Sequence, residues 1–500
     1  MSITNIARHF FASRWRELES YQTDGERMQR EVLAHLTERA KDTEYGRNHL
    51  FGAVKGYDDF VRNTPVNTYE ELKGDIDRMR QGEEDVLWPG RVKWYAKSSG
   101  TTNDKSKFIP VSAEGLKRIH YKGGADAVAL YLRNNPQSRM FDGRGLILGG
   151  SHAPNYNLPG SLVGDLSAIL IENINPVVNL FRVPKKQTAL LQDFEVKRDR
   201  IAREAMTKNV TNLSGVPSWM LSVLNRVMEL SGKTHLEEVW PNLEVFFHGG
   251  VAFTPYREQY RKLITSPLMH YEETYNASEG FFGLQDDPND KAMSLMIDYD
   301  VFYEFMPMDG DTAIPLWAVE KGKNYAMIIS TSCGLWRYMI GDTVQFTSLN
   351  PYKFIISGRT KSFINAFGEE LIVDNAEQGL AYACQKTGAV VQEYTAAPVF
   401  MDQHAKCRHQ WVVEFAKQPA SVQEFASILD RKLQELNSDY EAKRYKNITL
   451  QPLEIIVARD GLFNDWLKRK GKLGGQHKVP RLSNERTIID ELLKLNGVER

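Results

Sequence analysis

Short apolar runs alternate with amphipathic stretches and glycine-marked turns over residues 88–357. Residues 146–148 and 243–247 are apolar runs of strand length, whereas residues 216–230 and 256–264 carry the longer apolar spacing of helices. Strands and helices that alternate along a chain fold as helical layers packed on a sheet. We therefore predict an α/β fold rather than an all-β or an all-α one.

A polar break at residues 358–361 separates this region from a second one. Beyond the break, the patterns predict helices at 375–384 and 421–436 and strands at 410–415 and 453–457. These elements form an α+β unit of their own. We predict a large multi-sheet N-terminal domain over residues 1–355, a hinge at 356–362 and a smaller, mobile α+β C-terminal domain over 363–500.

Charge and cysteine usage exclude several classes of protein. The 500 residues include 63 Lys and Arg against 64 Asp and Glu, so the formal net charge is −1. That balance gives no long-range attraction to nucleic acid or to anionic membranes. Cys333, Cys384 and Cys407 have no metal-ligand or redox spacing, residues 1–16 do not form a secretory signal, and no apolar run approaches the length of a membrane span. We expect a soluble, cytoplasmic, monomeric protein.

A hydroxyl-rich segment follows the apolar run at residues 92–96. Residues 98–107 read Ser-Ser-Gly-Thr-Thr-Asn-Asp-Lys-Ser-Lys. Hydroxyls, backbone N–H groups and two lysines together suit a polyphosphate. The G-x-x-x-x-G-K-[ST] pattern is absent, which disfavours a P-loop NTPase. Taken alone, such a segment is more often a solvated surface loop.

Further polar motifs follow in order along the chain. They are Phe246-Phe247-His248-Gly249-Gly250, Tyr275-Asn276-Ala277-Ser278-Glu279, Arg337-Tyr338-Met339-Ile340-Gly341-Asp342, Gly358-Arg359-Thr360-Lys361, Asn437-Ser438-Asp439-Tyr440, Pro452-Leu453-Glu454-Ile455 and Gln476-His477-Lys478-Val479-Pro480-Arg481. With this set the chain resembles the acyl-adenylate-forming enzymes. Within them it resembles the auxin-responsive Gretchen Hagen family of acyl-acid amido synthetases, from about residue 90 to about residue 485.

Two departures from the plant members stand out. Asn103-Asp104 occupy positions of the phosphate loop where plant members carry small residues. The clear Gly358-Arg359-Thr360-Lys361 hinge is closer to the wider superfamily. Both features indicate a bacterial-type member, so plant hormone substrates do not follow from the resemblance.

The resemblance implies an enzyme that uses ATP and magnesium to convert a carboxylic acid into an acyl-AMP. An amine, in the family an amino acid, then attacks the acyl-AMP and AMP leaves. The implied phosphate-binding residues are Ser98, Ser99, Gly100, Thr101 and Thr102, with either Lys105 or Lys107 adding charge.

Other residues take roles from their motif positions. Glu279 is the implied catalytic magnesium ligand; its alternative is a surface carboxylate at a strand-to-helix turn. Asp342 is implied to bind both ribose hydroxyls; its alternative is a turn-forming aspartate. The remaining implied nucleotide-site residues are Gly249 and Tyr275 around the adenine, Ser278, Arg359 at the ribose or phosphate, and Lys361 at the hinge.

Lys478 is the implied catalytic lysine, which a mobile domain would bring to the α-phosphate during adenylation. Its alternative is a solvated charge in a Gly/Lys-rich loop. Tyr275 and His248 have the alternative of ordinary core residues. His152, Trp219 and Met220 lie in segments that could line the acyl pocket.

Two other functions remain open from the sequence. An acyl-CoA synthetase shares the adenylation half-reaction but forms a thioester. A non-catalytic nucleotide-binding scaffold would keep the fold and lose the chemistry. The presence of Glu279, Asp342 and Lys478 together argues against such a loss.

Overall fold

The structure is a computed structural model of the whole chain. It describes residues 3–98, 107–250, 253, 256–308, 310–359, 363–364, 371–399, 408–437, 440–441, 444, 450–470, 479–483 and 485–497. By their internal contacts the residues form two compact units. Unit 1 comprises Met1–Phe253, Glu258–Ile340 and Val344–Ile355, and unit 2 comprises Thr254–Arg257, Gly341–Thr343 and Ile356–Arg500.

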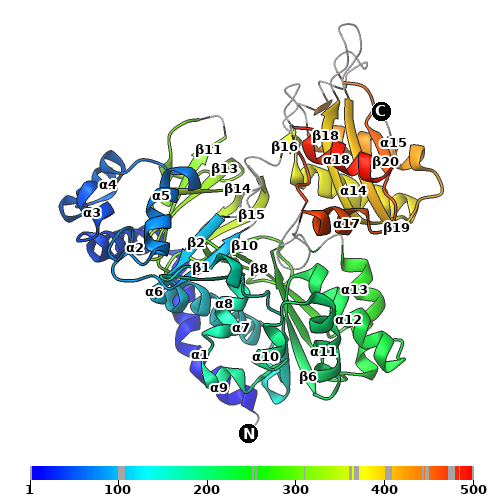
Figure 1. Cartoon of the computed structure of the whole chain (residues 1–500), viewed down its shortest axis with the longest axis horizontal. Coiled ribbons are helices and arrows are strands. Elements are labelled where there is room, and N and C mark those ends of the chain that lie inside the picture. Colours follow the sequence, from blue (N-terminus) through cyan, green and yellow to red (C-terminus); the bar gives the residue numbers. More distant parts are fainter. Residues whose placement is uncertain are drawn as a thin grey trace. The chain divides into compact units, whose positions relative to one another are not determined.

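A large mixed sheet forms the centre of unit 1 (Figure 1). In spatial order its described strands are β12 (Ile314–Pro315), β11 (Val301–Pro307), β13 (Asn324–Thr331), β14 (Tyr338–Leu349), β15 (Tyr352–Arg359), β10 (Met293–Leu295), β9 (Gly280–Leu284), β8 (His270–Ala277), β7 (Val245–Gly249), β6 (Val210–Gly215), β3 (Arg144–Ile147) and β5 (Arg182–Val183). The neighbouring strands β5, β3, β6, β7 and β8 are parallel to one another, and β9 is antiparallel to β8. The predicted α/β class is confirmed.

The predicted alternation of strands and helices holds only as far as β8. From β9 to β15 the described chain runs from strand to strand without an α-helix between them. The reason lies in the pattern of residues 280–359, where strand-length apolar runs are separated by short turns. Connections of that length favour antiparallel neighbours, because a parallel crossover needs a dozen residues or more.

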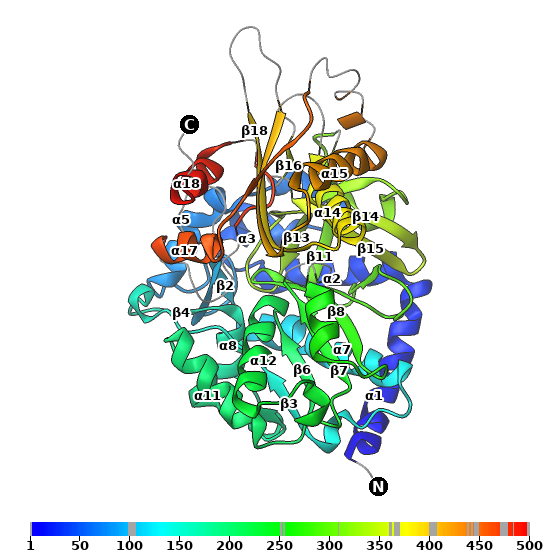
Figure 2. The same cartoon turned by 90° about the vertical axis from the view of Figure 1, so that its right-hand side faces the viewer.

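Helices cover both faces of the parallel strands (Figure 1, Figure 2). Phe246 and Phe247 are neighbours in β7, so their side chains point to opposite faces of the sheet. The ring of Phe247 meets Tyr131 of α7 (Lys122–Asn134), and the ring of Phe246 meets Tyr260 of α13 (Arg257–Leu263). A strand with both faces covered needs a continuous apolar run, as residues 245–247 have.

A smaller three-stranded sheet of unit 1 carries the hydroxyl-rich segment. It consists of β2 (Lys107–Val111), β1 (Trp94–Ser98) and β4 (Leu162–Gly164), with β1 antiparallel to β2 and parallel to β4. The other described α-helices of unit 1 are α1 (Ile3–Glu19), α2 (Gly25–Ala40), α3 (Glu44–Asn48), α4 (Tyr57–Asn63), α5 (Tyr69–Arg80), α6 (Ala113–Gly115), α8 (Leu166–Glu172), α9 (Pro176–Asn179), α10 (Lys186–Ala189), α11 (Phe194–Met206) and α12 (Pro217–Ser231).

Unit 2 is an α+β layer structure. Its described elements are β16 (Phe363–Ile364), β17 (Leu371–Ile372), α14 (Val373–Thr387), β18 (Val390–Val399), β19 (Arg408–Lys417), α15 (Val422–Leu436), β20 (Glu454–Val457), α17 (Leu462–Arg469) and α18 (Thr487–Leu495). In β19, Trp411 and Val413 pack in one core with residues of α14 and α15, whereas Val412 packs in a second core with residues of α17 and α18. Figure 2 shows these helix pairs on either side of β18.

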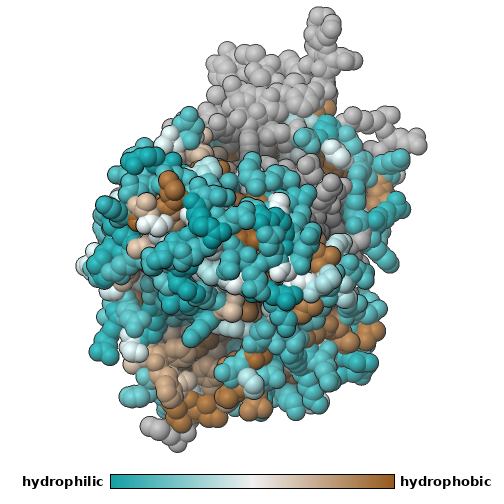
Figure 3. Space-filling view, turned by 60° about the vertical axis from the view of Figure 1, so that its left-hand side comes forward, coloured by the Kyte–Doolittle hydropathy of each residue, from teal (hydrophilic) through white to brown (hydrophobic). Residues whose placement is uncertain are grey.

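The surface is mostly polar. Figure 3 shows a largely hydrophilic face on which hydrophobic residues gather toward the lower end, the end where Figure 1 places α1 and α9. The exposed apolar side chains of those two helices are Ile3, Ile6 and Phe10 in α1 and Val177 and Val178 in α9. Within the described part of the chain, no helix has both the length and the apolar character that crossing a bilayer requires.

Candidate active site

The parallel strands of unit 1 bring several predicted residues to one edge of the sheet. Because β3, β6, β7 and β8 are parallel neighbours, their carboxyl ends lie along the same edge. Gly249 ends β7, and Ser278 and Glu279 follow β8 directly. In open α/β sheets, ligands bind outside the carboxyl ends of the strands. This edge is therefore the candidate site of unit 1.

Ser278 and Glu279 form the two-residue loop of a β-hairpin. Ala277 at the end of β8 pairs with Gly280 at the start of β9. The surrounding strands leave Ser278 only 6% and Glu279 only 8% exposed. Glu279 is thus neither a surface carboxylate nor part of a strand-to-helix turn, which corrects that alternative.

Gly249 is explained by the close approach of two strands. A Cβ atom at this position would lie 2.3 Å from the carbonyl oxygen of Thr274 in β8. Thr274 also donates a hydrogen bond from its hydroxyl to the His248 carbonyl, at 3.2 Å. No side chain fits between these backbones, so glycine is required at this position whether or not a nucleotide binds.

Tyr275 and His248 both pack among aromatic rings. The Tyr275 ring lies 5.0 Å from that of Phe282 and 5.9 Å from that of Phe354, and the residue is 6% exposed. The His248 ring stacks on Phe253 with 4.2 Å between centroids. Offset stacks and edge contacts of this kind stabilise a core. Both residues therefore contribute to the packing of unit 1.

The ends of the predicted phosphate loop lie side by side. Ser98, the last residue of β1, pairs with Lys107, the first residue of β2. The Lys107 ammonium lies 3.4 Å from the Tyr338 hydroxyl and 5.6 Å from the centre of the Tyr69 ring. The remaining predicted residues of this loop, Ser99, Gly100, Thr101, Thr102 and Lys105, lie outside the described residues.

Asp342 belongs to a strand and not to a turn. It is the fifth residue of β14 and is 8% exposed. Asn67 fixes the start of this strand, because its N–H donates to the Arg337 carbonyl and its carbonyl accepts from the Met339 N–H. Its side-chain amide also donates to the Trp336 carbonyl at 2.8 Å. The alternative of a turn-forming aspartate is therefore wrong.

The predicted acyl-pocket residues follow two neighbouring strands. His152 lies in the segment after β3, where its ring stacks on Trp94 at 5.5 Å and its Nε2 lies 3.3 Å from a Glu172 carboxylate oxygen. Trp219 and Met220 lie in the first turn of α12, which follows β6. Trp219 is partly exposed, whereas Met220 is fully buried.

The motifs of unit 2 include structural anchors. The Tyr440 hydroxyl donates to Asp430 at 2.7 Å, and Arg444 pairs with the same carboxylate at 2.7 Å. Arg481 donates to Glu393 at 2.7 Å, and its guanidinium lies over the Tyr394 ring at 4.7 Å. The Arg481 contacts fix the backbone on the C-terminal side of the segment that contains Lys478.

The other predicted residues of unit 2 have no described side chain. Arg359 is the last residue of β15, and its backbone alone is described. Lys361 and Lys478 lie outside the described residues.

The sequence does not predict the roles of four buried charged residues of unit 1. Arg337 pairs with Glu304 in the core, and Lys197 binds backbone carbonyls after β3. Glu272 in β8 is 5% exposed, and burial raises the pKa of its carboxyl to about 7. A pattern of spacing identifies the face of a helix or strand, but not the partner that a single charged residue meets across the fold.

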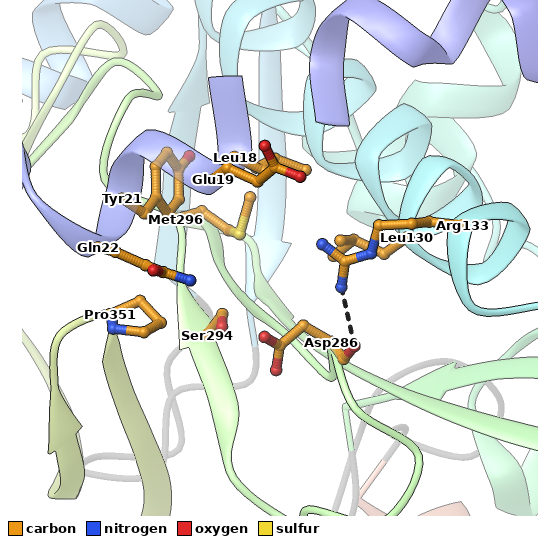
Figure 4. A pocket seen from close by; sticks show the side chains of 10 residues that line it. All are labelled: Leu18, Glu19, Tyr21, Gln22, Leu130, Arg133, Asp286, Ser294, Met296 and Pro351. Atoms are coloured by element: carbon orange, nitrogen blue, oxygen red, sulfur yellow. Dashed lines mark hydrogen bonds between the residues drawn. The ribbon is translucent and has the colours of Figure 1, made fainter. Parts of the chain in front are cut away.

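A cavity of about 60 Å³ lies elsewhere in unit 1 (Figure 4). Residues of α1, α7 and β10 contribute to it, and Arg133 donates to the Asp286 carbonyl at its margin, at 3.1 Å. Its volume holds a few water molecules but not a nucleotide. None of the predicted site residues lines it.

Similar solved structures give the fold. The chain superimposes on AtGH3.15 acyl acid amido synthetase in complex with 2,4-DB with a TM-score of 0.79 at 19% identity, covering 96% of this chain and 95% of that one. A 2-hydroxyisobutyryl-CoA ligase in the postadenylation state superimposes with a TM-score of 0.61 at 12% identity, covering 95% and 92%. The fold is that of the adenylate-forming enzymes.

Curated relatives match along nearly the whole chain. Probable indole-3-acetic acid-amido synthetase GH3.1 of Arabidopsis thaliana is 23% identical, covering 95% of this chain and 92% of that protein. Jasmonoyl-L-amino acid synthetase GH3.5 of Oryza sativa subsp. japonica is 23% identical, covering 94% of each. Models of the GH3 family match residues 14–269 for its N-terminal domain, 294–359 for its central domain and 374–487 for its C-terminal domain. The chain therefore belongs to the GH3 family, the family whose signature motifs its sequence carries.

Proposed function

We propose that the chain is an ATP-dependent acyl-acid amido synthetase, which joins a small carboxylic acid to an amino acid. The observation that carries the proposal is the match to all three GH3 domain models in order along the chain. Of the curated relatives, one is named a probable indole-3-acetic acid-amido synthetase and another a jasmonoyl-L-amino acid synthetase. The buried Glu279 at the carboxyl edge of the sheet supports the same function.

The first half-reaction forms the acyl-AMP. A carboxylate oxygen of the acid attacks the α-phosphorus of ATP, the bond to the bridging oxygen breaks, and pyrophosphate leaves. Ser98 through Thr102, with Lys105 or Lys107, bind the phosphates, and Asp342 binds the ribose hydroxyls. Lys478 offsets the charge that develops on the α-phosphate, the kind of stabilisation that contributes most to such transfers.

Glu279 is suited to magnesium. Mg²⁺ prefers oxygen ligands and usually binds through one or two carboxylates together with substrate phosphates. No group of three or more His, Cys, Asp or Glu side chains is arranged as a metal site in the described part of the chain. One carboxylate completed by nucleotide phosphates fits that donor set. The bound ion would offset phosphate charge.

The second half-reaction forms the amide. The amino nitrogen of the acceptor attacks the acyl carbon, the carbon–oxygen bond to AMP breaks, and the amine loses a proton. Rotation of the C-terminal domain about residues 356–362, with Arg359 and Lys361 in the hinge, exchanges one half-reaction for the other. We expect a monomer that acts in the cytoplasm without a nucleic-acid partner.

ATP–pyrophosphate exchange tests the first half-reaction. A panel of acids that includes indole-3-acetic, jasmonic and 2-hydroxyisobutyric acid is assayed, and the acid with the fastest exchange is then given twenty amino acids or CoA. An amide product with AMP supports the proposal. A thioester with CoA and no amide identifies an acyl-CoA synthetase. Nucleotide binding without exchange for any acid identifies a scaffold.

Lys478 has a matched control in the same Gly/Lys-rich segment, Lys472. We expect Lys478→Ala to lower the exchange rate by about a hundredfold, the loss typical of removing one stabilising donor. Lys472→Ala should leave the rate unchanged. Equal rates in the two variants would remove Lys478 from the mechanism.

A further inference from the structure

The turn after β3 is held by a buried lysine from α11. The Lys197 ammonium donates to the carbonyl of Gly149 at 2.7 Å, to the carbonyl of Gly150 at 2.9 Å and to the hydroxyl of Ser151 at 3.4 Å. An ammonium has three donors, and all three are used here. Lys197 is 3% exposed, a degree of burial that lysine reaches only when it is paired.

A second set of contacts fixes the same turn from α8 and the residue before it. The Ser151 N–H donates to the Asp165 carboxylate at 2.8 Å, and the Asp165 N–H donates to the Ser151 carbonyl at 3.0 Å. The Gly150 N–H donates to the Ser167 hydroxyl at 2.8 Å. A Cβ atom on Gly150 would lie 2.0 Å from an Asp165 carboxylate oxygen. No side chain therefore fits between the turn and the carboxylate.

The turn lies between two parts of the proposed site. Gly164 of β4 pairs with Ala96 of β1, so Asp165 comes next to Lys97, one residue before the phosphate loop begins at Ser98. Burial raises the pKa of the Asp165 carboxyl, while the Ser151 N–H and the positive charges of Lys197 and Lys97 lower it in part. On the other side, the turn continues directly into His152, a predicted residue of the acyl pocket.

We propose that Lys197 is a positioning residue for adenylation. Together with Asp165 it holds the Gly149–Ser151 turn in the position where the turn contacts the carboxylic acid and places it near Ser98. This inference rests on the proposed function. Preorganised groups of this kind raise the rate because the substrate enters a geometry that is already built. Lys197 acts through the turn and does not itself touch the substrate.

The environment of Lys197 makes its role dependent on pH. Burial lowers the pKa of Lys197 to about 8, although Asp165 raises it in part. The other charged or titratable groups near this pair are Lys97 and His152, which act on Asp165. Below pH 8 the ammonium supplies three donors, and above it the neutral amine supplies two. The turn therefore loses a hydrogen bond as the pH rises through about 8.

The sign of the stability change separates this effect from unfolding. The pKa of Lys197 in the fold lies below its ordinary value of 10.5, so between about pH 8 and 10.5 the unfolded chain binds more protons than the folded one. Stability from this group therefore rises with pH in that window. If the acid binds more weakly above pH 8, unfolding caused by Lys197 is therefore not the reason.

ATP–pyrophosphate exchange measures the contribution of Lys197 to adenylation, because this assay needs no amine substrate. The probe is the acid that gives the fastest exchange with the wild-type protein. We expect Lys197→Met to raise the KM for the acid by about tenfold or more, with the KM for ATP changed less than about twofold. Lys353→Met is the matched control. Lys353 is also mostly buried, but its partner is the Asp286 carboxylate at 2.9 Å and it does not touch the turn. Its KM for the acid should equal that of the wild type.

A second variant keeps the proposal testable should Lys197→Met not fold. In the wild type, the KM for the acid should rise between pH 7 and pH 9. In Lys197→Arg that rise should disappear, because a guanidinium stays charged throughout this range.

Three results would overturn the proposal. One is an acid KM for Lys197→Met within twofold of the wild type. Another is an alkaline rise that persists unchanged in Lys197→Arg. The third is a loss of exchange that equals the loss of folded protein measured by circular dichroism. Failure of the wild-type protein to exchange with any acid contradicts the proposed function itself, and the positioning role with it.

Discussion

Arg337 and Glu304 form a buried ion pair with two hydrogen bonds in unit 1. Arg337 Nε donates to one carboxylate oxygen at 2.9 Å and Nη2 donates to the other at 2.8 Å. The side chains are 6% and 1% exposed. Arg337 also donates to the Thr64 carbonyl at 2.6 Å and has a positive φ of 42°. The arginine of the Arg-Tyr-x-x-Gly-Asp motif therefore supports the strand that carries Asp342.

Arg337→Met should lower the free energy of unfolding by about 3–5 kcal/mol, because it leaves the Glu304 carboxylate buried without its cation. Urea unfolding followed by circular dichroism measures the change. The double variant Arg337→Met with Glu304→Leu should recover part of the loss, since it removes the unpaired charge as well. A single variant within 1 kcal/mol of the wild type would contradict this account of the pair.

Gly249→Ala should destabilise unit 1 by about 3 kcal/mol or more, since its Cβ would lie 2.3 Å from a backbone oxygen that cannot move without shifting β8. Gly124→Ala is the control, because a Cβ at Gly124 in α7 meets no atom within 4 Å. That change should stabilise the helix by about 0.5–1 kcal/mol. Thermal unfolding of the two variants compares them, and equal midpoints would refute the steric argument.

Glu272→Gln should raise the stability of the protein at neutral and alkaline pH but not at pH 5. Burial raises the pKa of Glu272 from 4.5 to about 7. Between these values the unfolded chain loses this proton before the folded one does, so wild-type stability falls as the pH rises. The glutamine has no charge to bury, and its gain should reach about 3 kcal/mol by pH 8.

The measurement is urea unfolding at pH 5 and pH 8. Glu273→Gln, on the same strand and less buried, is the control and should show no such difference. A gain for Glu272→Gln that is the same at both pH values would show that the carboxyl is not the cause.

Glu279→Gln should raise the magnesium concentration needed for half-maximal exchange by about tenfold or more, because an amide oxygen is a weaker ligand for Mg²⁺ than a carboxylate. The measurement is a titration of the ATP–pyrophosphate exchange rate against MgCl₂ at a fixed ATP concentration. Asp287→Asn, in the exposed loop after β9, should leave the titration unchanged. If both variants follow the wild-type curve, the proposed metal role of Glu279 fails.

Elements with a strong local pattern could be predicted from the sequence. The predicted helix at residues 421–436 is α15, and the runs at 146–148 and 243–247 correspond to β3 and β7. The reason is that an element buried on one face or on both faces has apolar residues at a regular spacing in the sequence. The antiparallel half of the sheet could not be predicted in this way, because strand periodicity does not state which neighbour a strand pairs with.

Single charged residues illustrate where sequence reasoning ends. Lys197 lies in a helix with six other charged residues among its first eleven, so nothing local distinguishes it from a solvated lysine. Its role depends on a turn about fifty residues earlier, which only the fold brings to it. Glu279 was singled out by its motif, but its burial follows from a hairpin that the sequence did not predict.

The pairing of Ser98 with Lys107 has a consequence for the evolution of this protein. Residues that face each other across two antiparallel strands are about 5 Å apart, so the eight residues between them leave and re-enter the sheet at one place. Insertions or deletions there need not displace either strand, and doubling such a connection costs only about 0.6 kcal/mol of closure entropy. Selection could therefore change the length and composition of the phosphate loop while the scaffold beneath it stayed the same.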